Sequence, residues 1–71
     1  MSRREAQRIA FQMARQAGTY GRIEALAGVT DRVAFWKDRT EQQARHDLRA
    51  LIAERLLRGE LQSTLSEAPP C

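Results

Sequence analysis

The sequence predicts an all-α protein, and three observations support this class. Hydrophobic residues make up 42% of the 71 residues and charged residues 30%, a balance typical of a folded chain. Alanine and leucine dominate the apolar set, and both prolines stand near the C-terminus. Apolar residues also recur with helical spacing in successive segments. We therefore expect one small domain of two to three helices over residues 1–65, followed by a disordered tail over residues 66–71.

The clearest predicted helix covers residues 40–58. Thr40 begins it as an N-cap, Gln43 completes a capping box, and Gly59 follows the last turn. The apolar positions recur every three or four residues, which places them on one face. This face consists of Ala44, Leu48, Leu51, Ile52 and Leu56.

A second apolar side on this helix predicts an interface. Ala50, Ala53 and Leu57 lie roughly opposite the main stripe, whereas Arg55 falls within the stripe and extends its guanidinium to the edge. A helix that is apolar on two sides is difficult to bury in a small monomer, so we expect a homodimer or a bound partner protein. In the alternative, Leu57 is covered by residues 60–65 folding back. The predicted interface residues are Leu48, Leu51, Ile52, Arg55 and Leu57, together with Phe11 and Phe35.

Residues 3–17 predict an N-terminal helix with a basic outer face. Ser2 is the predicted N-cap, and the inner face is mostly alanine, which permits close helix packing but buries little area. The opposite face carries Arg4, Arg8 and Arg15, with Phe11 at its flank. Such a stripe suits contact with phosphates or with an acidic partner; otherwise it is a solvated face.

Residues 22–39 have two incompatible interpretations. Either one helix continues through Gly28, or Gly28 ends a short helix and Thr30 caps a second one from Asp31 to about Arg39. In the second case, the turn resembles that of a helix-turn-helix, although Glu24 stands where a small residue is usual. With residues 40–58, either interpretation forms a helical hairpin over residues 22–58, against which the N-terminal helix packs.

No pattern in the sequence predicts catalysis, a metal site or a cofactor. His46 falls on the polar side of its helix, and Asp47 beside it faces another direction. Cys71 is the only cysteine and ends the chain, which leaves no cysteine–histidine cluster. The chain has no apolar leader and no run of about 20 apolar residues. We expect a cytoplasmic protein that is not an enzyme.

Two functions are predicted. The first is a regulatory or adaptor protein that self-associates and binds or inhibits a partner protein, by analogy in size and composition with phage and plasmid accessory proteins. The alternative is a DNA-binding regulator of helix-turn-helix type, for which nucleic acid is the partner. Its contacts come from the N-terminal arginines and the second helix: Arg3, Arg4, Arg8, Thr30, Arg32 and Arg39.

Overall fold

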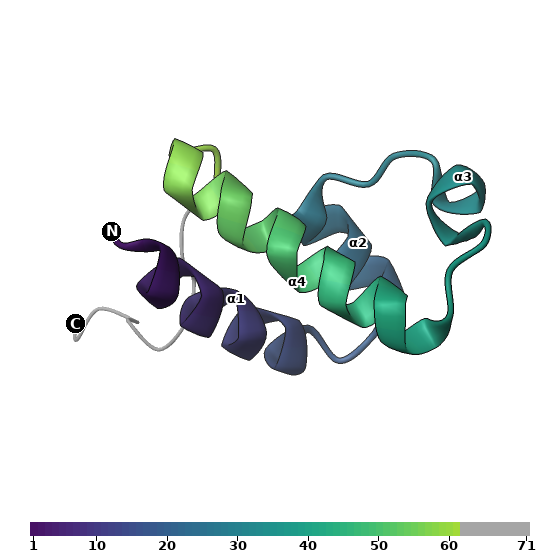
Figure 1. Cartoon of the computed structure of the whole chain (residues 1–71), viewed down its shortest axis with the longest axis horizontal. Coiled ribbons are helices and arrows are strands. Elements are labelled where there is room, and N and C mark those ends of the chain that lie inside the picture. The colour runs from purple at the N-terminus through teal and green to yellow at the C-terminus, as the bar shows by residue number, and fades with distance from the viewer. Residues whose placement is uncertain (62–71) are drawn as a thin grey trace.

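Four helices joined by short turns make up the part of the chain that the structure describes (Figure 1). The computed structural model describes residues 1–61. The helices are α1 (Arg3–Ala17), α2 (Tyr20–Ala27), α3 (Arg32–Trp36) and α4 (Glu41–Arg58). The all-α prediction is confirmed, with one more helix than expected because the segment after α1 divides in two. The predictions for the tail over residues 66–71, for Leu65 and for Cys71 lie outside the described residues.

Hydrogen bonds from cap residues set the helix boundaries. Ser2 Oγ accepts from the backbone N–H of Glu5 at 3.1 Å, which begins α1 as predicted. Thr40 Oγ1 accepts from Gln43 N–H at 3.1 Å, and Gln43 Oε1 accepts from Thr40 N–H at 3.4 Å. This reciprocal pair is the predicted capping box of α4. At the other end, Gly59 adopts φ 76°, the left-handed conformation of a C-cap.

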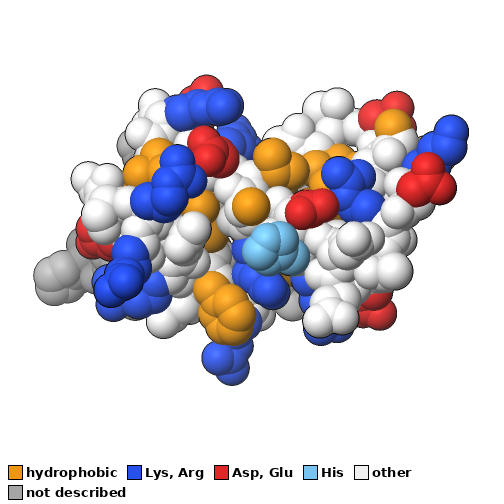
Figure 2. All heavy atoms as spheres, viewed as in Figure 1, with side chains coloured by type: hydrophobic (Ala, Val, Ile, Leu, Met, Phe, Trp, Pro, Cys, Tyr) orange, Lys and Arg blue, Asp and Glu red, His pale blue; other side chains and the backbone are white. Residues whose placement is uncertain are grey.

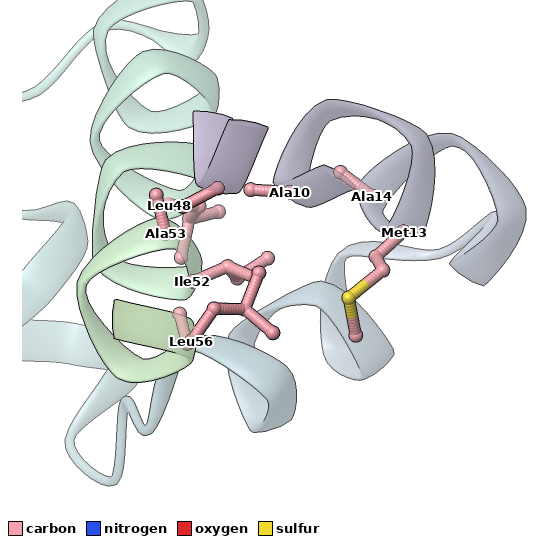
Figure 3. Close-up of a cluster of buried hydrophobic side chains, with 9 residues drawn as sticks. Ala10, Met13, Ala14, Leu48, Ile52, Ala53 and Leu56 are labelled. Carbon is pink, nitrogen blue, oxygen red and sulfur yellow. The ribbon is translucent and has the colours of Figure 1, made fainter. Parts of the chain in front are cut away.

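The core is formed mainly between α1 and α4, which run side by side in opposite directions (Figure 1). Ala6 and Ala10 on α1 are completely buried, as are Leu48 and Ile52 on α4. Because alanine is small, the backbone of α1 approaches the leucine and isoleucine side chains closely (Figure 3). The thin alanine face of α1 is therefore the principal packing surface for α4. Met13, Ala14, Ala27, Ala53 and Leu56 complete the cluster.

The buried face of α4 is rotated from the one predicted. Leu51, assigned to the main stripe, is 38% exposed, whereas Ala53, assigned to the opposite side, is only 2% exposed. The reason is that α4 packs against α1 on one side and α2 on the other, so its buried arc is wide and centres on Ile52. Leu57 is half-buried against the same core, together with Leu61 of the following segment.

The helix break at Gly28 settles the two interpretations of residues 22–39. Gly28 adopts φ 82° and ends α2, so one continuous helix is wrong. The second helix also differs from its prediction. Asp31 rather than Thr30 is its N-cap, and it ends at Trp36 instead of Arg39. Its end coincides with the turn before α4, where Asp38 has a positive φ of 62°.

A buried carboxylate attaches α3 to α2. Glu24 is 2% exposed, and its Oε2 accepts a hydrogen bond from Trp36 Nε1 at 2.6 Å. Its Oε1 lies 2.6 Å from Arg32 Nε. The Trp36 ring meets the Tyr20 ring edge-to-face, with 5.3 Å between centroids. Since α3 has no buried residue of its own, these polar and aromatic contacts largely hold it in place.

Arg55 performs a similar function at the end of α2. Its guanidinium Nη1 donates to the carbonyl oxygens of Leu26 at 2.8 Å and Ala25 at 3.4 Å. These carbonyls belong to the last turn of α2, where the helix dipole favours a cation.

None of the four described helices combines the length and the hydropathy needed to cross a membrane.

Candidate protein-binding surface

A groove opens where the end of α1, the start of α2 and the first half of α4 meet. Its volume is about 260 Å³. The floor is apolar and includes Ile23 and the buried Leu48. Three arginines line it, Arg15 from α1 and Arg45 and Arg49 from α4, and its lining contains no acidic residue. The other lining residues are Phe11, Ala14, Gly18, Thr19 and Tyr20.

The groove exists because arginines stand on the core-facing side of α4. Arg45, Arg49, Ile52 and Leu56 follow i, i+4, i+7 and i+11 spacing, which places them along one side of the helix. At the last two positions this side contacts α1 through apolar groups. At the first two positions it meets the last turns of α1, beyond which the chain turns into α2. The apolar contact between α1 and α4 therefore ends at the groove, where the side chains are basic.

Phe11 forms one wall of the groove on α1. It is 46% exposed, and the guanidinium carbon of Arg49 lies 5.0 Å from its ring centroid. Arg4, Arg8, Phe11 and Arg15 share one side of α1, again at i, i+4, i+7 and i+11 spacing. This stripe and the groove are continuous through Phe11 and Arg15. Basic side chains border hydrophobic ones on the face that Figure 2 shows.

Tyr20 forms the opposite wall and fixes one of the arginines. Its hydroxyl donates to Glu41 Oε2 at 2.7 Å and accepts from Arg45 Nε at 2.6 Å. Arg45 Nη2 also pairs with Glu41 Oε2 at 2.9 Å. The hydrogen bond from Tyr20, and then the charge of Arg45, lower the pKa of the Glu41 carboxyl. The separate hydrogen bond that Arg45 donates to the Tyr20 hydroxyl raises the pKa of Arg45.

Five ion pairs within residues 1–61 leave several arginines of this surface without a carboxylate partner. The pairs join Arg3 to Glu54, Arg32 to Glu24, Arg39 to Asp47, Arg45 to Glu41 and Arg55 to Glu60. Among residues 1–61, no carboxylate lies within ion-pair distance of Arg4, Arg8, Arg15 or Arg49. Four of the seven cations without an ion pair among residues 1–61 thus lie on the stripe of α1 and the rim of the groove, and the other three are Arg22, Lys37 and Arg58.

The structure separates the residues predicted for protein interaction. Phe11 and Leu51 lie on the surface, whereas Leu48 and Ile52 are enclosed within the single chain. Phe35 and Leu57 are half-buried against the core, and Arg55 is occupied by the carbonyls of α2. The Phe35 ring is covered by Arg39, whose guanidinium carbon lies 4.2 Å from the ring centroid. Of this set, Phe11 and Leu48 line the groove, and of these two only Phe11 is exposed.

The residues predicted for DNA contact are divided between the two ends of the molecule. Arg3, Arg4 and Arg8 lie on α1 near the N-terminus, far from α3 (Figure 1). Arg32 pairs with Glu24, and Arg39 pairs with Asp47 at 2.8 Å and donates to the carbonyl of Phe35. Thr30 is exposed but does not cap α3. Arg32 of α3 and Arg39 in the turn before α4 are thus both engaged within the chain.

Sequence reasoning missed the groove itself. Tyr20, Ile23, Arg45 and Arg49 were not among the predicted site residues. A usable signal was present, because the i, i+4, i+7, i+11 spacing that joins Arg45 and Arg49 to Ile52 shows that two cations share the core-facing side.

His46 is exposed, and residues 1–61 contain no group of three or more metal-ligating side chains. Comparisons of the chain with protein-family models, characterised proteins and solved structures give no match.

Proposed function

We propose that the protein is a small non-enzymatic regulatory or adaptor protein that acts by binding another protein through its helical surface. The observation that carries this proposal is the exposed Phe11 beside an apolar groove with an arginine rim. Aromatic and arginine side chains are enriched among the residues that dominate binding energy at protein interfaces. Here both types surround one concave apolar surface, which is the arrangement expected of an anchor site.

Self-association is the less supported part of this proposal. The sequence argument for a homodimer was that both apolar sides of α4 need cover. In the folded chain, Leu48 and Ile52 are buried by α1, and Leu57 is half-buried against the core. Any homodimer would therefore use the remaining surface, of which Leu51 and Phe11 are the large apolar residues of α4 and α1. Sedimentation equilibrium over a range of concentrations tests this directly.

DNA binding remains the alternative proposal. The turn at Gly28 and the basic stripe of α1 favour it. Against it, α3 has five residues, and its Arg32 is engaged by Glu24. A mobility-shift assay at several salt concentrations tests it, because phosphate contacts weaken steeply as salt rises. Binding to duplex DNA that depends on Arg32 more than on Phe11 would favour this alternative.

Affinity capture with matched variants tests the main proposal. The bait is the tagged protein in a nuclease-treated lysate of its source organism, with captured proteins identified by mass spectrometry. Phe11→Asp changes an exposed wall of the groove, and Lys37→Asp is the control at an exposed site after α3. We expect at least one protein that the wild type and the control capture and Phe11→Asp does not. Capture that is abolished by nuclease, or that ignores Phe11, contradicts the proposal.

A further inference from the structure

We propose that the groove between α1, α2 and α4 receives an apolar side chain from an acidic helix of the partner protein, whose carboxylates pair with Arg15 and Arg49. This inference rests on the proposed function and specifies the chemistry of the partner. Four properties of the groove support it: its size, its charge, the order of its walls and the absence of an open sheet edge beside it.

The size of the groove suits a protruding side chain. Its volume of about 260 Å³ falls below the roughly 300–1,000 Å³ typical of small-molecule sites. Ile23 and Leu48 give the floor an aliphatic character that suits an apolar side chain, and the exposed ring of Phe11 stands beside it. A leucine-sized or phenylalanine-sized group from a partner would cover this floor and remove it from water.

The charge of the groove selects an acidic partner. Its lining holds three arginines and no carboxylate, so a basic partner would meet repulsion from several sides. Arg45 already pairs with Glu41 and is partly neutralised. Arg15 and Arg49 have no carboxylate within ion-pair distance among residues 1–61, and guanidinium groups bind carboxylates bidentately. An occupant therefore needs carboxylates close to its apolar anchor.

The walls of the groove are ordered before any partner arrives. Tyr20 holds Arg45 through a hydrogen bond of 2.6 Å, and Arg49 stacks near the Phe11 ring. Groups that are already oriented lose less conformational entropy on binding. Since residues 1–61 contain no β-strand, an extended segment has no sheet edge on which to add. Helix-in-groove binding is a common mode of peptide recognition that needs no sheet edge, and side chains one turn apart on such a helix would reach the rim.

Fluorescence anisotropy with designed peptides tests this inference. The probe is a labelled amphipathic helical peptide with a central leucine and glutamates one turn to each side. Two sister peptides carry glutamine or lysine in place of the glutamates, and a labelled single-stranded oligodeoxynucleotide represents nucleic acid. The protein variant is Arg15→Glu/Arg49→Glu. Its control, Arg22→Glu/Lys37→Glu, changes the net charge equally at exposed sites that do not line the groove.

We expect the glutamate peptide to bind the wild type and the control variant alike, and the groove variant about tenfold more weakly. We also expect Phe11→Ala to weaken binding, and the glutamine and lysine peptides to bind less well than the glutamate peptide. Circular dichroism on each variant ensures that only folded proteins are compared. A second probe of the apolar contact is the replacement of the central leucine of the peptide by glycine, which leaves the protein unchanged.

Several results would overturn the inference. The inference is wrong if the glutamate peptide does not bind, or if the glutamine peptide binds as tightly as the glutamate peptide. It is also wrong if both charge variants lose the same affinity for the glutamate peptide, or if the oligonucleotide binds more tightly than that peptide. A homodimer that dissociates only in the Arg15→Glu/Arg49→Glu variant would place a second copy in the groove instead. The proposed function and this inference can fail separately. If a partner is captured through Phe11 but its capture does not change with Arg49→Glu, the proposed function stands and the acidic helix is ruled out as the occupant of the groove.

Discussion

The rotation of α4 predicts that two neighbouring leucines differ strongly in their contribution to stability. Leu48 is completely buried between α1 and α4, whereas Leu51 is 38% exposed. Leu48→Ala removes buried methyl groups and leaves a cavity, at a cost of about 3 kcal/mol. Leu51→Ala leaves no enclosed cavity, so we expect a cost of about 1 kcal/mol or less. Because both variants make the same chemical change, the difference between their free energies of unfolding reports only the different environments of the two leucines.

The expected difference is large for a protein of this size. At about 0.05–0.15 kcal/mol per residue, a chain this long unfolds with a free energy of roughly 4–10 kcal/mol. Leu48→Ala therefore removes about 30% or more of the total and lowers the melting temperature by roughly 12–24 °C. Urea unfolding followed by far-ultraviolet circular dichroism measures both variants, and Trp36 fluorescence provides an independent probe beside α3. Coincident transitions from the two probes justify the two-state treatment.

Equal losses in the two variants would refute the placement of the buried face on α4. A larger loss for Leu51→Ala would return the face to the position that the sequence predicted. If Leu51→Ala is costly and its effect grows with protein concentration, a homodimer interface covers Leu51. The concentration series therefore separates an error in helix rotation from an additional contact between chains.

Three further predictions concern the turns and the polar contacts. Gly28→Ala should cost about 1 kcal/mol, because φ is 82° there, whereas Gly21→Ala, where an added Cβ meets no atom within 4 Å, should stabilise α2 by about 0.5 kcal/mol; thermal unfolding compares them. Trp36→Phe removes the N–H donor to the buried Glu24 and should cost about 1–2 kcal/mol in urea unfolding. The lowered pKa of Glu41 means that its charge stabilises the fold above the ordinary value of 4.5, and that this contribution disappears as pH falls through the lower folded value. Urea midpoints measured from pH 4.5 downward should therefore decrease more steeply in the wild type than in Glu41→Gln.

The helix ends could be predicted from the sequence because their bonds are local. Ser2 and Thr40 accept hydrogen bonds from backbone groups three residues later, and Gly59 needs only a conformation that glycine adopts readily. The break at Gly28 belongs to the same class, although the sequence left a continuous helix open as the other interpretation. The cap of α3 was assigned one residue early, since Thr30 and Asp31 both have side chains that cap helices.

The buried face of α4 and the groove depend on tertiary packing and could not be predicted in the same way. The periodicity of α4 shows which residues share a side, but not that α2 would cover Ala53. Glu24 shows the same limit. It stands where a helix-turn-helix usually has a small residue, yet Arg32 and Trp36 satisfy both of its carboxylate oxygens and keep it in the interior.

The placement of Arg45 and Arg49 connects the fold to the proposed function. Apolar area is scarce in so short a chain, and α1 contributes mostly alanine to the core. Even so, two positions on the core-facing side of α4 carry arginine, where leucine would extend the apolar seam toward Tyr20. The arginines at these positions bury less apolar area than leucine would, which lowers stability. In exchange, they leave an apolar groove with positively charged walls. Sites for binding commonly cost stability in this way, and this cost is our reason for locating the function here instead of on α3.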